Sequence, residues 1–198
     1  MDFFMSTMTV TQQLKDISEQ YKKLLDIDQN GKGRFRLFKG NKTYFGNCML
    51  IILPYISSHG FMNADYERVN LIETLNSYNM FNTIIIYAQP SKSHGPSRTL
   101  IKNSREILNN LLEIIDPNLI IVLDDSSAEL FLNQKPNIIE NHGTIITNHF
   151  NIPVVLTYNL DYYNKRTGYE DDNYKKSIFY EDWDYIYELY KERINANV

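Results

Sequence analysis

Four short, almost wholly apolar runs stand out along the chain, at 48–53, 83–88, 119–123 and 154–157. Each is rich in Ile, Val or Leu, which is typical of parallel strands that are covered on both faces. Segments with helical apolar spacing lie between and after these runs: 66–78, 97–115, 126–132 and 180–194. This alternation predicts an α/β protein, a three-layer sandwich around a central four-stranded, mainly parallel sheet.

The residues before the first run predict two smaller elements. Apolar positions at three- and four-residue steps indicate an amphipathic helix between Thr9 and Asp28. The extended runs 35–38 and 43–45 flank a Gly40-Asn41 turn signal, which predicts a small hairpin. A length of 198 residues fits one domain, with the helix and hairpin at 9–46 and an α/β core at 47–198.

Composition excludes several classes of protein. The single Cys48 excludes an internal disulfide and a multi-cysteine zinc or iron–sulfur site, and its apolar surroundings predict a buried thiol in a reducing compartment. No apolar run approaches the ~20 residues that span a membrane, so a cytoplasmic location and no membrane partner are expected. A net charge of −4 is unlike a free-standing basic nucleic-acid binder, although a local cationic groove is compatible with it.

The clearest candidate site follows the last apolar run. Thr157, Tyr158 and Asn159 emerge at the end of a buried strand, where a parallel sheet presents its ligand crevice. Two tyrosines and two cations come next, at Tyr162, Tyr163, Lys165 and Arg166. The pattern predicts a binding site at this strand end.

Four segments, in order, resemble the uracil-DNA glycosylase superfamily, especially its compact microbial and phage-like branches. The first follows the 48–53 run, and the second is Tyr87-Ala88-Gln89-Pro90 before a helix. The third has Pro117, Leu123, Ala128 and Leu132 in matching places, and the fourth is Thr157-Tyr158-Asn159, where the family has Thr-Tyr-His-Pro. The resemblance covers most of the chain from about Cys48 onward and implies a glycosylase-like fold.

The residues that carry the family's chemistry differ in this chain. Leu53-Pro54 stands where the family has an acidic residue or asparagine, and Ile84 stands where an asparagine reads the base edge. Asn159 replaces the histidine that stabilises the departing base. Because each charge-stabilising donor contributes roughly 2.7–4 kcal/mol, standard uracil excision is not expected. The chain is therefore interpreted as a nucleic-acid-binding or scaffolding protein, such as a viral replication accessory.

The resemblance also suggests which residues contact DNA. In the family, the segment after the last strand inserts a bulky side chain into the duplex, a role open here to Tyr162 or Tyr163. Lys165 and Arg166 would contact phosphate beside Tyr158 and Asn159. The remaining predicted contacts, Lys92, His94 and Arg98, belong to a cationic track after the second strand, which Lys102 and Arg105 continue.

Two alternatives remain open. A divergent active glycosylase would use Asn159, with Asn63, Asp65 or His94 in shifted roles. A structural subunit or inhibitor would instead bind a protein partner, including a replication protein, through its last helix. In that helix Asp184, Tyr185, Tyr187 and Tyr190 alternate with core-directed Trp183, Ile186 and Leu189.

Other polar clusters have simpler interpretations. His59, His94 and His142 each precede a glycine, which indicates turns. His142 and His149 lack a third ligand at metal spacing, so neither a metal nor a cofactor is predicted. Asp124-Asp125 before two serines indicates a helix N-cap more simply than a magnesium site.

Overall fold

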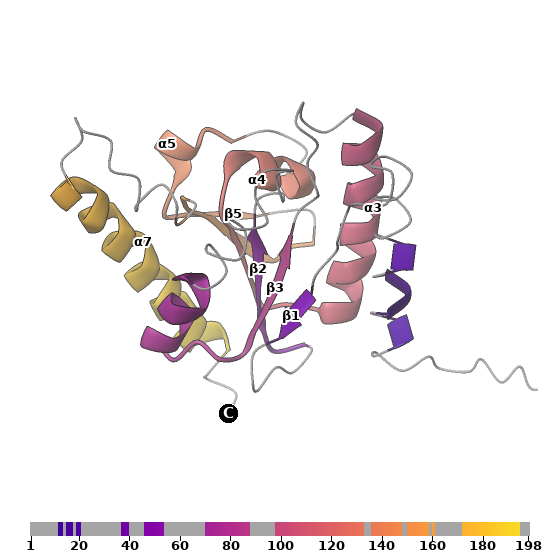
Figure 1. The fold of residues 1–198 in the computed structure, drawn as a ribbon, viewed down its shortest axis with the longest axis horizontal. Coiled ribbons are helices and arrows are strands. Elements are labelled where there is room, and N and C mark those ends of the chain that lie inside the picture. Colours follow the sequence, from indigo (N-terminus) through magenta and orange to yellow (C-terminus); the bar gives the residue numbers. More distant parts are fainter. Residues whose placement is uncertain are drawn as a thin grey trace, which may run out of the picture.

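A computed structural model of the chain describes residues 12–20 without 14 and 18, 37–39, 46–53, 70–87, 98–132, 136–147, 150–158, 160 and 172–194. Within these residues, a six-stranded sheet is flanked by helices on both of its faces (Figure 1). The predicted α/β class and the mainly parallel sheet are confirmed. None of the described helices has both the length and the apolar composition that crossing a membrane requires.

The four predicted strands form the parallel centre of the sheet. In chain order the strands are β1 (Leu37–Lys39), β2 (Met49–Leu53), β3 (Thr83–Tyr87), β4 (Leu119–Val122), β5 (Thr144–Thr147) and β6 (Pro153–Leu156). They lie side by side in the order β1-β3-β2-β4-β6-β5. β2 is parallel to β3 and β4, and β4 is parallel to β6.

The expected count of four strands was too low because each edge carries an additional antiparallel strand. β1 falls in the first extended run of the predicted hairpin, but it pairs with β3. The predicted turn and second run, at 40–45, lie outside the described residues. β5 pairs with β6 and was not predicted. An edge strand pairs through the backbone of one neighbour, so its own residues need not form a continuous apolar run.

The helices follow the predicted segments with shifted ends. Helical residues occur within 12–20 and at 70–77, followed by α3 (Arg98–Ile115), α4 (Asp125–Leu132), α5 (Ile138–Asn141) and α7 (Asp172–Arg193). α7 begins at Asp172, well before the expected Tyr180. The short α5 was not predicted and is capped by the Asn137 side chain, which accepts the Ile139 N–H at 3.1 Å.

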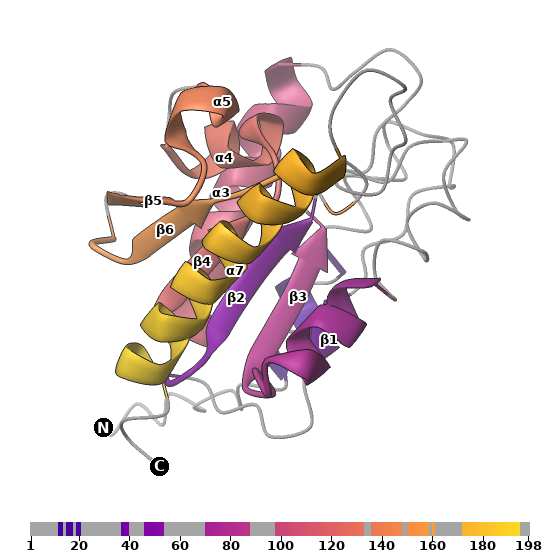
Figure 2. The ribbon, with the colours of Figure 1, turned by 90° about the vertical axis from the view of Figure 1, so that its left-hand side faces the viewer.

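The sheet separates two hydrophobic clusters. All five residues of β2 are buried, with Leu50 and Ile52 in the cluster that α3 and α4 cover. Met49, Ile51 and Leu53 belong to the opposite cluster, beneath α7 and the 70–77 helix (Figure 2). Because both faces are buried, a continuous apolar run is the pattern that such a strand requires.

Tight turns close the edge of the sheet at which the parallel strands begin. A left-handed residue precedes each of these strands: Gly46 (φ 76°), Asn79 (φ 56°), Asp116 (φ 47°) and Asn151 (φ 58°). Glycine, asparagine and aspartate are the residue types that adopt this conformation most readily. The opposite edge, at the carboxyl ends of the strands, is where 54–69, 88–97 and 159–171 leave β2, β3 and β6. Ligands of open parallel sheets bind at that carboxyl edge.

Candidate functional site at the carboxyl edge

The predicted strand end is present on β6. Val154, Val155 and Leu156 are fully buried, and the Thr157 N–H continues the ladder by donating to the Val122 carbonyl at 3.0 Å. Thr157 is also fully buried, whereas Tyr158 is half-buried. The strand therefore carries polar side chains from the core toward the carboxyl edge, as the sequence pattern indicated.

A buried carboxylate lies beside this strand end. Asp182, in the middle of α7, has only 3% of its surface exposed. It accepts a hydrogen bond from Thr157 Oγ1 at 2.6 Å and lies 2.9 Å from Nδ1 of His142. A buried carboxylate is costly unless it is hydrogen-bonded, so the hydroxyl and the imidazole stabilise Asp182 in this position.

The turn after α5 places His142 against Asp182. The Gly143 N–H donates to the Leu156 carbonyl at 2.9 Å, which ties the turn to the end of β6. Gly143 has a φ of 65°, and a Cβ at this position would lie 2.5 Å from Oδ1 of Asp182. Only glycine permits this close approach without displacing the carboxylate.

The histidine is held in a defined orientation. Its side chain is 24% exposed, and its ring centroid lies 5.1 Å from that of Tyr158 at an interplanar angle of 43°. A carboxylate only accepts hydrogen bonds, so the hydrogen of this contact lies on Nδ1; Nε2 then carries a lone pair in the neutral ring and a hydrogen in the imidazolium. Nε2 makes no hydrogen bond to a residue in the described part of the chain. The imidazole can thus accept or donate a proton beside the strand end.

The predicted N-cap after β4 is confirmed. Oδ1 of Asp124 accepts the Ser127 N–H at 2.6 Å, and α4 begins at Asp125. This side chain therefore satisfies a backbone donor in the first turn of the helix. Among the described residues, no group of three or more His, Cys, Asp and Glu side chains is placed to hold a metal ion.

Most of the predicted nucleic-acid contacts lie outside the described residues: Lys92, His94, Asn159, Tyr162, Tyr163, Lys165 and Arg166, together with Asn63 and Asp65. Arg98 is the first residue of α3. Tyr158 is described, and its ring packs beside His142. In the strand order, β2 and β4 separate β3 from β6. With neighbouring strands about 4.8 Å apart, the segments that follow β3 and β6 begin about 14 Å from each other along one edge.

Sequence reasoning missed the pairing of His142 with Asp182. The turn assigned to His142 is present, but the role of its side chain depends on a residue 40 positions away. Asp182 did leave a signal, because it lies four residues from both Ile178 and Ile186, which are buried. Residues spaced by four share one face of a helix, so an acidic residue at this position points toward the core.

Comparison with protein-family models finds no match, and comparison with curated protein sequences finds no significant one.

Proposed function

We propose that the chain binds nucleic acid at the carboxyl edge of its sheet, on a fold similar to that of uracil-DNA glycosylases and without standard uracil excision. The observation that carries the proposal is the shared parallel edge. Segments 54–69, 88–97 and 159–171 leave their strands at the edge where Thr157 and Tyr158 emerge. The strands that lead into the predicted cations and tyrosines therefore end at one edge of the sheet.

The absence of standard excision is supported by two core residues. Ile84 is fully buried within β3 and belongs to the cluster beneath α3. Leu53, at the end of β2, is 1% exposed and packs in the opposite cluster. Both side chains are apolar and used for packing, so neither can read a base edge or position water as the residues of active family members do.

Binding is tested with fluorescently labelled single- and double-stranded DNA over a range of salt concentrations. We expect the double variant Lys165→Ala/Arg166→Ala to bind more weakly and to reduce the slope of log K against log salt by about 1.4–1.8, the value for two phosphate contacts. A matched control, Lys15→Ala/Lys191→Ala, removes the same charge from residues outside the predicted interface. Equal weakening by both double variants would contradict a localised interface.

Excision is measured in parallel. Excess protein is incubated with labelled uracil, hypoxanthine and thymine-mismatch duplexes under single-turnover conditions, and alkali then reveals abasic sites. The proposed function predicts binding without strand cleavage. If the wild type cleaves these duplexes and Asn159→Ala does not, the chain is an active glycosylase and the proposed function is wrong.

The His142–Asp182 pair specifically favours that second candidate, a divergent active glycosylase. In its imidazolium form, His142 can donate from Nε2 the proton or hydrogen bond that the family obtains from the residue at the position of Asn159. His142→Asn keeps an amide donor near the position of Nδ1 and removes Nε2. His142→Gln places an amide nearer to Nε2 and gives up the bond to Asp182.

These two variants separate chemistry from structure. An active enzyme loses about 100-fold or more of its single-turnover rate in His142→Asn, with a melting temperature close to that of the wild type. If the histidine is purely structural, His142→Gln is less stable than His142→Asn, because it gives up the bond to Asp182. Neither substitution then lowers the cleavage rate by more than its loss of stability explains.

A further inference from the structure

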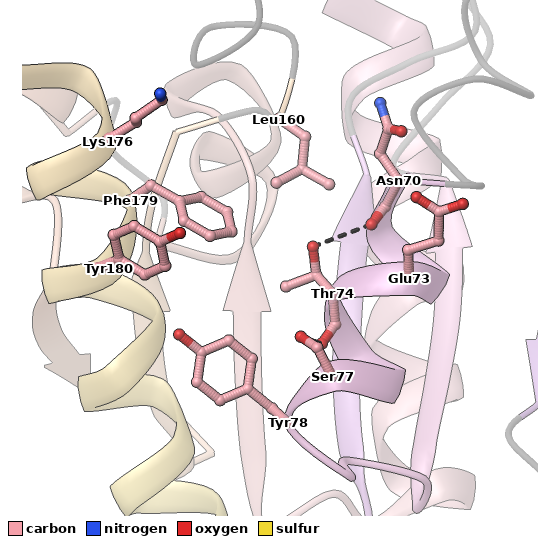
Figure 3. Close-up of a pocket in the computed structure, with 9 residues that line it drawn as sticks. All are labelled: Asn70, Glu73, Thr74, Ser77, Tyr78, Leu160, Lys176, Phe179 and Tyr180. Atoms are coloured by element: carbon pink, nitrogen blue, oxygen red, sulfur yellow. Dashed lines mark hydrogen bonds between the residues drawn. The ribbon is translucent and has the colours of Figure 1, made fainter. Parts of the chain in front are cut away.

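A second, unassigned site lies between two helices. A pocket of about 430 Å³ separates the 70–77 helix from the amino-terminal half of α7 (Figure 3). Its lining consists of Asn70, Glu73, Thr74, Ser77, Tyr78, Leu160, Lys176, Phe179 and Tyr180. The volume lies within the range of about 300–1,000 Å³ that is usual for small-molecule sites.

One side of the pocket is aromatic. Phe179 and Tyr180 project from α7, with their ring centroids 5.5 Å apart at an angle of 77°. Phe179 also packs against the fully buried Trp183, at a centroid distance of 6.0 Å. A fixed aromatic surface with one exposed member offers a planar ligand a face on which to stack.

Tyr78 closes one end of the pocket and links its two helices. Its hydroxyl donates to Oδ1 of Asp184 at 2.8 Å, and its ring centroid lies 5.5 Å from that of Tyr187. These contacts hold the helices at a fixed spacing below the cavity. Contacts within the protein therefore hold the pocket open, which reduces the entropic cost of binding.

The opposite wall presents a buried donor. Nδ2 of Asn70 is buried and has no hydrogen-bond partner among the described residues. The neighbouring hydroxyls are engaged, because Thr74 donates to the Asn70 carbonyl at 2.9 Å and Ser77 donates to the Thr74 carbonyl at 2.8 Å. An unpaired buried donor destabilises the folded protein, and a ligand acceptor at this position would relieve that cost.

The chemistry of these groups identifies a class of ligand. A carboxamide offers one donor and one acceptor side by side, which matches the edge of a nucleobase. Lys176, on the aromatic side, is exposed and provides a cation at the pocket in Figure 3. A nucleobase can stack on the aromatic rings of the other wall, which strengthens binding whatever the base is.

We propose that this pocket binds one nucleotide, with its base against Phe179 and Tyr180, its base edge on Asn70 and its phosphate on Lys176. The nucleotide is either free or an unstacked unit of a nucleic-acid strand. Leu160, which lines the pocket, directly follows Asn159 of the predicted strand-end interface. The pocket is nevertheless a separate site, so its occupation does not depend on the function proposed above.

The full chain contains one tryptophan, Trp183, which reports on the Phe179 wall. Titration with UMP, CMP, AMP and GMP is expected to give a saturable change in its emission for at least one of them. Asn70→Ala should weaken that binding at least tenfold, whereas Lys176→Ala should weaken the nucleotide but not its nucleoside. Tyr174→Ala, 62% exposed on the same helix and outside the lining, is the matched control.

The source of the nucleotide is identified by competition. A single-stranded oligonucleotide that displaces the mononucleotide assigns the pocket to a strand, and failure to displace it assigns the pocket to free nucleotides. The Lys165→Ala/Arg166→Ala variant should keep its mononucleotide affinity, which separates this site from the strand-end interface. No saturable signal at millimolar nucleotide, or equal affinities in Asn70→Ala and Tyr174→Ala, would overturn the proposal.

Discussion

The contact between Gly143 and Asp182 makes a quantitative test of the buried network possible. In Gly143→Ala, the new Cβ would lie 2.5 Å from Oδ1 of Asp182, the oxygen that also faces Nδ1 of His142. The carboxylate must then move. Because Asp182 is only 3% exposed and is also bonded to Thr157, it cannot move without weakening hydrogen bonds that water does not replace.

The expected destabilisation has two parts. An L-residue in the left-handed conformation costs roughly 1–2 kcal/mol. Disrupting one hydrogen bond of a buried carboxylate adds about 1–3 kcal/mol. Gly143→Ala should therefore lower the free energy of unfolding by about 2–5 kcal/mol, measured by urea denaturation with circular dichroism as the signal.

Gly46→Ala provides the matched control. Gly46 has a φ of 76°, but the nearest atom to its added Cβ is Oδ2 of Asp116, at an ordinary distance of 3.7 Å. This substitution should cost only the conformational part, about 1–2 kcal/mol. The additional loss of stability in Gly143→Ala, relative to Gly46→Ala, should disappear when Asp182 is also replaced by alanine, because the obstructing carboxylate is then absent. Equal losses for the two glycine variants, or an excess that survives in Asp182→Ala, would refute the reasoning.

Two further predictions concern buried groups. Burial, with the nearby charge of Asp116, raises the pKa of the Cys48 thiol from 9.0 to about 12. The unfolded chain therefore loses this proton first, and the wild type should lose roughly 1–2 kcal/mol more stability than Cys48→Ala between pH 8 and pH 10, measured by urea unfolding. Tyr190→Phe removes the acceptor of the Asn82 N–H, 2.9 Å away, and should cost about 1–3 kcal/mol in the same assay, whereas the exposed Tyr185→Phe should be neutral.

The central strands were predictable because their environment imposes a simple pattern. β4 is buried along its whole length, and a strand covered on both faces must be apolar at every position. The sequence also indicated where β4 begins, since Pro117 follows the left-handed Asp116 at the end of α3. Local chemistry and burial agree at this position, so the pattern could be recognised without knowing the partner strands.

The edge strands and the start of α7 lacked such a pattern. β5 reads Thr-Ile-Ile-Thr, with Ile145 39% exposed, so its pairing depends on the free side of β6 rather than on its own burial. The first turns of α7 place only Ile178 in the core among their described side chains. Once a helix is nucleated, each added residue contributes a backbone hydrogen bond, so it extends beyond the apolar pattern.

Tyr190 shows a similar limit, because the sequence grouped it with the exposed aromatic face of the last helix. It is in fact 1% exposed, and its hydroxyl accepts the Asn82 N–H. A tyrosine fits a core when a polar partner meets its hydroxyl, and that partner comes from the turn before β3. Of the four residues assigned to that face, Tyr190 is therefore part of the core, while Asp184 and Tyr185 are exposed and Tyr187 is half-buried.

The buried network constrains how substitutions at the strand end should be interpreted. Asp182 connects the turn before β5, the end of β6 and the middle of α7, so a change at any of these positions acts on the others. Thr157→Val removes one donor to Asp182 without touching Nε2 of His142. If it weakens nucleic-acid binding as much as His142→Asn does, the network acts by positioning the strand end. If only His142→Asn weakens binding, the imidazole itself contacts the nucleic acid, because Nε2 is the group that this substitution alone removes.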